Sequence, residues 1–332
     1  MRIAIATDAW FPQVNGVVRT MNRVVEELRA LGHEVEPFGP ERFLTVACPT
    51  YPEIRLAIAP GRKLGELFER FRPQAIHVST EGPLGLAARR YCLSLRRPFT
   101  TAYHTRFPEY VEARTKLPVR HAYRWLRRFH GPSRGIMVAT DSIRRELEQW
   151  GFANIRPWSR GVDTDLFRPR DKSWLDLKRP VHLYVGRVAV EKNVAAFLAL
   201  DLPGSKMVVG NGPMLPELKQ RYPAVHFAGA RHGEDLARHY AAADLFVFPS
   251  RTDTFGLVML EALASGLPVA ACPVPGPLDV IGNTDVGVLS EDLAAAARAA
   301  LAIPPERCRD FALRFSWRRT AEQFLGNLAP FG

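Results

Sequence analysis

The sequence predicts an α/β protein made of two doubly wound domains, each with a parallel sheet between layers of helices. Short apolar runs typical of strands buried on both faces alternate with longer amphipathic segments of helical period. A length of 332 residues corresponds to about two domains of ordinary size. The charged, proline-containing stretch at residues 168–178 is the expected linker between them.

In the first half, the opening residues 2–7 predict a buried strand, followed by a loop and a helix that ends near Leu31. The loop lacks the G-x-G-x-x-G pattern, which argues against a nicotinamide or flavin enzyme. Its Asn15-Gly16 pair is compatible with an ordinary turn. The elements expected next are helices at 62–72, 84–95, 118–134 and 141–150, and strands at 34–38, 75–80, 99–103 and 135–140.

In the second half, a buried strand from Val181 ends at Gly186 and is followed by two cations, Arg187 and Lys192, before a helix. Cations at this place can neutralise a diphosphate without a metal, or they are solvated loop residues. The remaining strands are expected near residues 206–209, 225–229, 245–248 and 268–271, with helices at 255–265, 293–303 and 315–328. Two prolines are expected to stiffen a loop at 273–277.

The acids Asp253 and Glu261 mark a candidate site around the strand at 245–248. Asp253 is expected in the loop after that strand, and Glu261, eight positions later, about two turns into the following helix. Ligands of open parallel sheets bind at the carboxyl ends of strands, where helix N-termini attract phosphate. The alternative is that Asp253 caps the helix and Glu261 is a solvated helix residue.

Composition limits the classes of function. The 47% apolar content is ample for two packed cores, the N-terminal apolar run is too short for a signal peptide, and no run approaches the ~18 residues of a membrane span. The cysteines have no pair spacing, so neither a disulfide framework nor a zinc site is expected and a cytoplasmic location fits; they are Cys48, Cys92, Cys272 and Cys308.

The charge is concentrated in the first half of the chain. Residues 1–165 hold 26 Lys and Arg against 17 Asp and Glu, which is +9, and residues 166–332 hold 19 against 17, which is +2. Such a half suggests nucleic acid, an anionic membrane surface or an acidic substrate as partner. The segment 118–134 is either a basic amphipathic helix on a membrane or a core helix with a solvated basic rim. No nucleic-acid-binding module is recognised.

Several of these motifs resemble those of family 4 retaining glycosyltransferases, which have the GT-B fold. They are the two acids around Thr-Phe-Gly, the Pro-x-x-Asn-Gly-Val loop ending in Gly16-Val17, His104-Thr105, Gly161-Val-Asp163, Gly186-Arg187 with Lys192-Asn193, and Gly210-Asn-Gly212-Pro213. The resemblance covers essentially the whole chain. It implies an acceptor domain at 1–167 plus 316–332, a donor domain at 176–315, a cleft between them, and a C-terminal helix that crosses back to the first domain.

The resemblance also implies residue roles. Glu261 is expected on the donor ribose, Asp253 and His104 beside the transferred sugar, and Arg187 and Lys192 on the donor diphosphate. A lone histidine is more often structural, and Asp253 is one methylene shorter than the glutamate usual in the family. The other donor-binding positions implied are Gly16, Gly186, Gly210, Gly212, Thr254, Phe255 and Gly256. No metal and no cofactor are expected. Asp163-x-Asp165, which looks like a metal-binding pair, is instead assigned to the segment that ends the first domain.

The activity implied is transfer of a hexose from a UDP- or GDP-sugar to a hydroxyl group with retention of configuration. The motifs look most like α-mannosyltransferases and sulfoquinovosyl- or glucosyl-diacylglycerol synthases, which favours a lipid acceptor and a peripheral position on the inner face of the plasma membrane; a glycan or small-molecule acceptor stays open. The alternatives are a GT-B sugar phosphorylase or epimerase and a basic nucleic-acid-binding protein.

Overall fold

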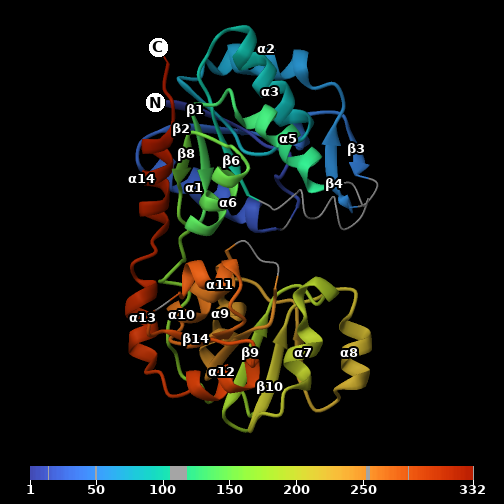
Figure 1. The fold of residues 1–332 in the computed structure, drawn as a ribbon, viewed down its shortest axis with the longest axis vertical. Coiled ribbons are helices and arrows are strands. Elements are labelled where there is room, and N and C mark those ends of the chain that lie inside the picture. The colour runs from blue at the N-terminus through green and yellow to red at the C-terminus, as the bar shows by residue number, and fades with distance from the viewer. Residues whose placement is uncertain (14, 49–50, 105–117, 252–254, 283, 332) are drawn as a thin grey trace. The chain divides into compact units, whose positions relative to one another are not determined.

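The chain forms two compact units. The computed structural model describes residues 1–13, 15–48, 51–104, 118–251, 255–282 and 284–331. Unit 1 comprises Met1–Arg160 and Trp317–Gly332, and unit 2 comprises Gly161–Ser316 (Figure 1). The chain therefore passes from unit 1 into unit 2 and returns for its last helix, as the sequence predicts.

The first boundary lies earlier than expected because the segment after residue 160 packs on unit 2. The Phe167 ring meets the Tyr240 ring edge to face at 5.4 Å. Farther along, Lys172 Nζ and Arg179 Nη1 donate to the Asp244 carboxylate at 2.9 and 2.6 Å. The stretch 168–178 is thus attached to unit 2 and is not a free connector.

Unit 1 contains a six-stranded parallel sheet, a separate two-stranded hairpin and six described helices. The sheet strands are β1 (Arg2–Ala6), β2 (Glu34–Phe38), β5 (Ala75–Val78), β6 (Thr100–Tyr103), β7 (Gly135–Val138) and β8 (Ile155–Pro157). The helices are α1 (Gly16–Ala30), α2 (Gly61–Phe71), α3 (Pro83–Ser94), α5 (Val119–His130), α6 (Asp141–Gln149) and α14 (Trp317–Asn327). A 3-10 turn, η1, covers Pro40–Arg42.

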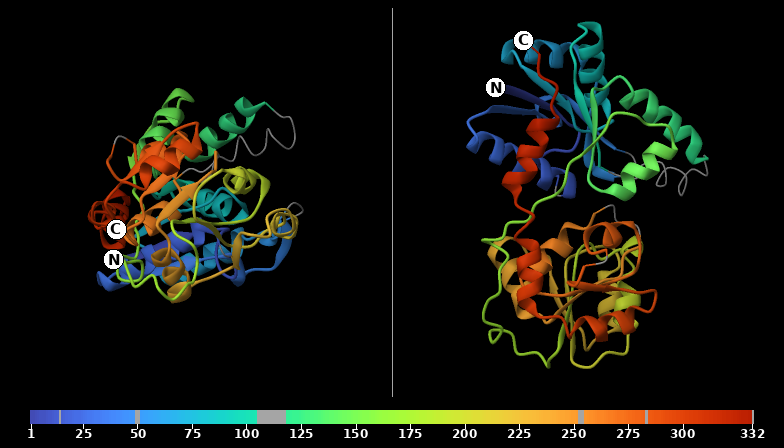
Figure 2. Two further views of the ribbon diagram at one scale, coloured as in Figure 1. Left: turned by 90° about the horizontal axis from the view of Figure 1, so that it is seen from below. Right: turned by 60° about the vertical axis from the view of Figure 1, so that its left-hand side comes forward.

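The strand order of unit 1 is β2-β1-β5-β6-β7-β8, with every pair parallel. Alternate β1 residues enter two cores: Ile3 and Ile5 pack with α1 and α14, whereas Ala4 and Ala6 pack with α2, α3 and Phe129 of α5. Helices therefore cover both faces of the sheet, which parallel sheets require (Figure 2).

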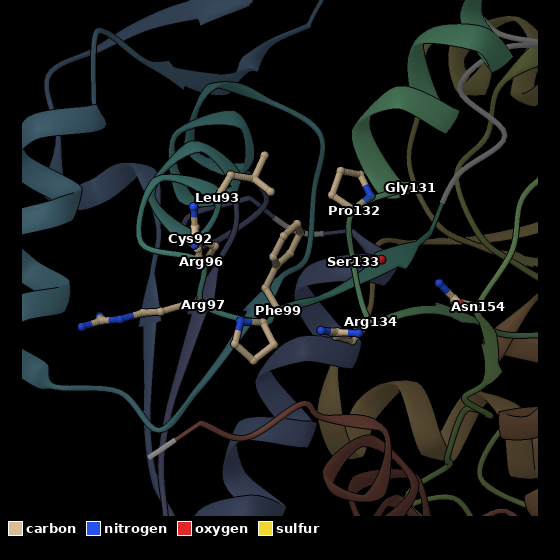
Figure 3. A pocket seen from close by; sticks show the side chains of 11 residues that line it. Cys92, Leu93, Arg96, Arg97, Phe99, Gly131, Pro132, Ser133, Arg134 and Asn154 are labelled. Carbon is tan, nitrogen blue, oxygen red and sulfur yellow. The ribbon is translucent and has the colours of Figure 1, made fainter.

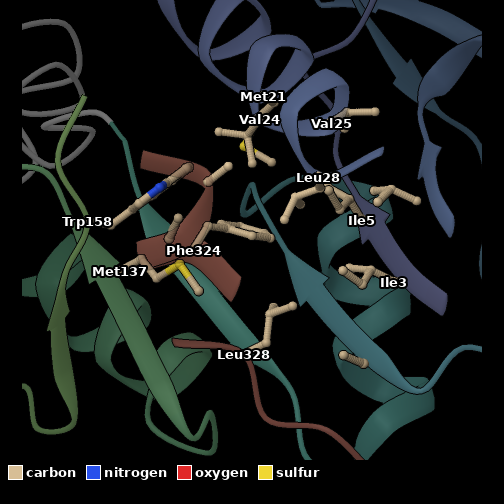
Figure 4. Close-up of a cluster of buried hydrophobic side chains, with 14 of the residues drawn as sticks. Ile3, Ile5, Met21, Val24, Val25, Leu28, Met137, Trp158, Phe324 and Leu328 are labelled. Atoms are coloured by element: carbon tan, nitrogen blue, oxygen red, sulfur yellow. The ribbon is translucent and has the colours of Figure 1, made fainter. Parts of the chain in front are cut away.

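The return helix α14 completes the first of these cores. Phe324 is fully buried against Trp158, with ring centroids 5.2 Å apart, and shares a cluster with Met21 and Val24 of α1 (Figure 4). Trp158 Nε1 donates to the Thr320 carbonyl at 3.2 Å. Helix α14 is therefore an internal part of unit 1.

The hairpin of β3 (Thr45–Cys48) and β4 (Tyr51–Ala57) was not expected from the sequence. It is antiparallel, and its Val46–Leu56 pair lies on one face. The ladder is irregular between Ala47 and Cys48. Such a short, bulged ribbon gives no clear alternating pattern.

Unit 2 also has a six-stranded parallel sheet, in the order β11-β10-β9-β12-β13-β14. Its strands are β9 (Val181–Val185), β10 (Ser205–Val209), β11 (His226–Gly229), β12 (Leu245–Phe248), β13 (Val269–Ala271) and β14 (Gly287–Leu289). Its helices are α7 (Val194–Ala199), α8 (Leu215–Arg221), α9 (Gly233–Ala242), α10 (Leu257–Ala264), α11 (Pro275–Val280), α12 (Leu293–Ala300) and α13 (Pro305–Ala312). The 3-10 turn η2 covers Val190–Lys192.

Helices α7, α8 and α12 pack on one face of this sheet around Phe197, Leu218 and Ala297. Helix α9 is on the other face, where the Tyr240 ring lies 6.0 Å from the ring of Phe246 in β12. The doubly wound fold predicted for both halves is confirmed. One local expectation is wrong: the prolines at 273–277 start helix α11, with Pro275 in its first turn, and do not stiffen a loop.

No helix in the described part of the chain has both the length and the apolar character needed to cross a bilayer.

The packing of α14 predicts that Phe324→Ala lowers the free energy of unfolding of unit 1 by about 3–5 kcal/mol, because it leaves a cavity in a closed core. Amide hydrogen exchange of β1 and β5 in a urea series would measure the change. Glu322→Ala on the same helix is the control, since it removes only an exposed contact with Arg318 and is expected to cost less than about 0.5 kcal/mol. Equal losses in the two variants would contradict the assignment.

Candidate functional site

The strand orders place two groups of loops at the carboxyl edges of the sheets. In unit 2, successive strands are added toward one edge of the sheet up to β11 and toward the other edge from β12 onward, so the strand order reverses between β9 and β12. In unit 1 it reverses between β1 and β5. Loops that follow the two strands at such a switch point enclose a crevice, which is the usual ligand site of a doubly wound sheet. The predicted site residues after β9, β12 and β6 therefore lie at the correct edge of their sheets.

The loop after β9 carries the two predicted cations of unit 2. Arg187 is exposed, and Lys192 is half-buried at the end of η2. Asn193 then adopts a left-handed conformation and donates from Nδ2 to the Pro249 carbonyl at 3.3 Å. This contact joins the loop after β9 to the end of β12, so the structure brings the two predicted motifs of the switch point together.

The glycines of the donor motifs allow close packing between neighbouring loops. A Cβ on Gly210 would lie 1.8 Å from the Gly186 carbonyl oxygen, and a Cβ on Gly212 would lie 2.3 Å from that of Val188. The loops are also hydrogen-bonded, with Val188 N donating to the Asn211 carbonyl at 2.9 Å. Glycine at 210 and 212 is therefore required inside unit 2, whether or not a ligand approaches.

The N-terminus of α10 has the properties of an anion site. Its N-cap, Gly256, has φ +80°, and no side chain caps the helix in the described structure. Met259 N donates to the Gly256 carbonyl at 2.9 Å, whereas the N–H groups of Leu257 and Val258 lack intrahelical partners and lie at the positive end of the helix dipole. Phe255 before it is buried. Asp253 and Thr254 lie outside the described residues, so their predicted roles stay predictions.

Glu261 is a buried carboxylate on α10, not a solvated helix residue. It is 5% exposed, and Tyr240 Oη donates to its Oε2 at 2.9 Å. Carboxylates are rarely buried without a partner that uses them. Ser250, at the end of β12, is also fully buried, and its Oγ has no hydrogen-bond partner in the part of the chain described. Both polar groups come after β12 in the chain, on the β12 side of the switch point.

In unit 1, His104 is half-buried directly after β6 and both of its ring nitrogens have partners. Nε2 lies 3.1 Å from Ser79 Oγ, and Nδ1 lies 3.5 Å from Arg160 Nη2. The imidazole also meets the Trp158 indole edge to face at 5.7 Å. Burial, followed by the charges of Arg160, His77 and His130, lowers the pKa of His104 well below its ordinary value. His104 is therefore neutral at physiological pH and is not poised as a general acid.

Asp8 follows β1 and organises the other side of the unit 1 switch point. Its carboxylate accepts from the backbone N–H groups of Leu84 and Gly85 at 2.9 and 3.3 Å and from Thr80 Oγ1 at 2.8 Å. Asp8 thus binds the N-terminus of α3 and holds the loop that also carries Ser79. Burial raises its pKa, although these three hydrogen bonds act in the opposite direction.

Gly16 begins α1, behind the N-cap Asn15, whose Oδ1 accepts from the N–H groups of Val17 and Val18 at 3.0 Å. A Cβ at Gly16 would meet no atom within 4 Å. Packing within the described structure therefore does not require glycine here. Its predicted approach to a donor diphosphate stays a prediction.

Helix α5 corrects the expectation that its apolar face could lie on a membrane. Tyr123 and Leu126 are buried in the core of unit 1, and Val119 packs against the same cluster. The exposed face instead carries Trp125, 42% accessible, together with arginines. The exposed arginines of this helix are Arg120, Arg124, Arg127 and Arg128.

A pocket of about 340 Å³ in unit 1 is not part of this site. It is lined by residues that include Arg96, Arg97, Phe99 and Arg134 (Figure 3). Phe99 and Arg134 immediately precede β6 and β7, so the pocket lies at the amino ends of these strands, whereas His104 follows the carboxyl end of β6. Within this pocket, Arg97 Nη1 already donates a hydrogen bond to Tyr91 Oη at 2.5 Å.

Sequence reasoning missed four residues of the site, namely Asp8, Ser79, Arg160 and Tyr240. Asp8 follows the strand predicted at residues 2–7, and Ser79 lies at the end of the strand predicted at residues 75–80, so polar side chains at strand ends are the signal that could have found them. Arg160 precedes the Gly161-Val-Asp163 motif. Tyr240 had no signal, because its contact with Glu261 joins two helices 21 residues apart.

Two family models match the chain. The model described as Glycosyltransferase Family 4 matches residues 14–166, and the model described as Glycosyl transferases group 1 matches residues 179–303. Their limits are close to the division between the two units.

Curated relatives match over most of the chain. A GDP-mannose-dependent alpha-mannosyltransferase of Mycobacterium tuberculosis is 30% identical over 87% of this chain and 83% of its own length. A sulfoquinovosyl transferase of Arabidopsis thaliana is 30% identical over 83% of this chain and 60% of its own length. An alpha-monoglucosyldiacylglycerol synthase of Streptococcus pneumoniae is 29% identical over 92% and 79%.

Solved structures confirm the predicted GT-B fold. A sucrose-phosphate synthase of Thermosynechococcus elongatus matches with a TM-score of 0.76 at 22% identity, covering 98% of this chain and 97% of its own. HepE of Anabaena, solved in complex with UDP, matches with a TM-score of 0.71 at 14% identity, covering 98% of each chain. At these identities the likeness establishes the fold alone.

The environment of Asp8 predicts a pH-dependent effect of Asp8→Asn. Because the pKa of Asp8 is raised on folding from the ordinary 3.8, the folded state binds more protons than the unfolded state between the two pKa values, and the wild type loses stability as pH rises through that window. The variant lacks this loss. Its unfolding free energy relative to wild type should therefore increase from about pH 3 upward and then level off, as measured by urea unfolding across pH. A relative stability that falls with pH would contradict this.

Proposed function

We propose a donor, an acceptor and a stereochemical course for this chain, which belongs to the family 4 glycosyltransferases. The donor proposed is a UDP- or GDP-sugar bound in unit 2. The observation that carries this proposal is the β12 side of the switch point, where no described side chain caps the N-terminus of α10 and the buried carboxylate of Glu261 follows. An anion-binding helix end and, about one and a half turns further along, a carboxylate that accepts hydrogen bonds suit a diphosphate and the hydroxyl groups of a ribose.

Each chemical group of the nucleotide-sugar donor has proposed binding residues in unit 2. Arg187 and Lys192, with the N–H groups that begin α10, would neutralise the diphosphate. Glu261, held by Tyr240, would accept hydrogen bonds from the ribose hydroxyls. The loops after β9 and β10, which Gly186 and Gly210 allow to pack closely, would form the wall beside the nucleotide. No metal ion or cofactor is included in the proposal.

The proposed reaction retains the anomeric configuration. The bond from the anomeric carbon to the departing diphosphate breaks, and the acceptor oxygen bonds to that carbon on the same face of the sugar. The acceptor's proton passes to the departing diphosphate, so no protein carboxylate needs to act as a nucleophile. The cations at residues 187 and 192 stabilise the charge that develops on the leaving group. His104 and Asp253 would position the sugar.

The acceptor proposed is the hydroxyl group of a membrane lipid or glycolipid. Relatives of this chain include an alpha-monoglucosyldiacylglycerol synthase and a phosphatidylinositol dimannoside mannosyltransferase. The exposed face of α5 combines four arginines with Trp125. Arginine is attracted to anionic lipid and tryptophan favours the membrane–water interface. This face would hold unit 1 on an anionic membrane.

Donor binding tests the assignment of unit 2. The melting temperature of the purified protein is expected to rise with one of UDP, GDP or ADP and with its sugar conjugate. Glu261→Gln should then weaken that ligand by at least about tenfold, because a charged hydrogen-bond acceptor is lost. Glu217→Gln, an exposed change on α8, is the matched control. With this donor, the product glycolipid should keep the donor's anomeric configuration by proton NMR. Unaltered nucleotide affinity in Glu261→Gln would rule out its assignment to the ribose.

Vesicle binding tests the membrane surface. The double variant Arg120→Gln/Arg124→Gln should lose about 1 kcal/mol per arginine toward anionic vesicles, roughly 30-fold in the partition constant. Lys219→Gln/Arg221→Gln, which removes the same charge from α8 of unit 2, should change little. Sedimentation with phosphatidylglycerol and phosphatidylcholine vesicles measures both. Equal partitioning of the wild type to anionic and neutral vesicles would remove this proposal.

A further inference from the structure

We propose that Arg160 is a positioning residue for His104, whose imidazole it fixes as the neutral tautomer with the proton on Nε2. The inference rests on the proposed function, in which His104 lies beside the transferred sugar. It adds a residue that none of the predicted roles includes.

The hydrogen-bonding chemistry of the two side chains sets the tautomer. A guanidinium has only donors, and Arg160 Nη2 lies 3.5 Å from His104 Nδ1. A proton on Nδ1 would point at a cation, so Nδ1 must present its lone pair. The ring proton is then on Nε2, where Ser79 Oγ accepts it at 3.1 Å. Arg160 thus donates to His104, and His104 donates to Ser79.

Arg160 is itself fixed in place. It is only 6% exposed, and its Nη1 donates to the carbonyls of Trp158 and Ser159 at 2.8 and 3.3 Å. Its guanidinium lies over the Trp158 indole, 4.3 Å from the centroid. No ion pair of Arg160 occurs in the described part of the chain. Among the described residues, carbonyl oxygens and the Trp158 ring face this cation in place of a carboxylate.

The other groups around His104 act in the same direction. Besides Arg160 after β8, the titratable neighbours are His77 on β5 and His130 at the end of α5. His77 is fully buried with its pKa lowered to about 3, so it is neutral. Glu81 pairs with His130 Nε2 at 3.3 Å. No described carboxylate contacts His104 to stabilise an imidazolium.

A neutral and rigid imidazole suits a positioning role. With Nδ1 and Nε2 both engaged inside unit 1, the ring cannot flip without breaking both contacts. A ring held in one orientation presents the same atoms to the substrate in every turnover, which is the requirement of a near-attack geometry. Removing Arg160 should free the ring to adopt the second tautomer and weaken one of the causes of its lowered pKa.

The test compares the wild type with Arg160→Met, Arg160→Gln and the exposed control Arg156→Met. Nitrogen NMR of histidine-labelled protein distinguishes protonated from unprotonated ring nitrogens, and His104→Gln assigns the signal. In the wild type and the control, His104 should show an unprotonated Nδ1 at neutral pH, since its pKa is lowered well below the ordinary value. In Arg160→Met the ring should populate both tautomers, and its pKa should rise above that of the wild type because the charge of Arg160 is lost, while burial, the larger cause, still holds it below the ordinary value.

Turnover provides the second readout. In Arg160→Met, kcat should fall by about 10- to 100-fold and fall further as pH is lowered, whereas KM for the donor, which binds unit 2, should change little. Arg160→Gln replaces the methionine variant if that variant fails to fold, because glutamine can still donate to the carbonyls. It also removes the charge, so the pKa of His104 should rise in this variant too.

Two results would overturn the inference. One is a proton on Nδ1 of His104 in the wild type at neutral pH. The other is an unchanged tautomer and pH profile in the Arg160 variants, even with reduced kcat, because this would show a structural role only. If the wild type transfers no sugar, the proposed function fails, while the NMR result still decides the role of Arg160.

Discussion

The buried indole of Trp158 is the contact on which unit 1 depends most. It packs against Phe324 of α14 and lies edge to face with His77 of β5, and its Nε1 donates to the Thr320 carbonyl. The same ring supports the guanidinium of Arg160. One side chain therefore completes the hydrophobic core and also packs against His104 and Arg160 of the polar cluster. Packing changes in the core reach that cluster through a single rigid group.

The doubly wound architecture could be predicted because its physical causes are local. A parallel strand covered on both faces must be apolar throughout, so Leu245–Phe248 and Val181–Val185 are recognisable without any alignment. The same rule predicts functional residues after the carboxyl ends of strands, and the structure places His104, Arg187 and Glu261 after β6, β9 and β12, while their roles stay predictions. The elements that were not predicted are short or irregular. They are the β3–β4 hairpin and helix α11, which begins in a proline-rich stretch.

The partners of these residues could not be predicted, because they are set by packing between distant segments. Tyr240 reaches Glu261 from a different helix, and Arg160 reaches His104 across 56 residues. Helix α5 shows the same limit. Its amphipathic pattern is equally compatible with a core or a membrane, and only the buried positions of Tyr123 and Leu126 show which face is turned inward. Periodicity identifies an amphipathic helix and does not identify what covers it.

The position of α14 has a consequence for how the protein is made. The core of unit 1 includes Phe324 and Ala321, which the ribosome adds only after every residue of unit 2. Domains usually fold in the order of their synthesis, but here the first half of the chain waits with part of its apolar surface open while the second half is completed. Molecular chaperones therefore have their longest access to the surface of α1 that α14 will cover.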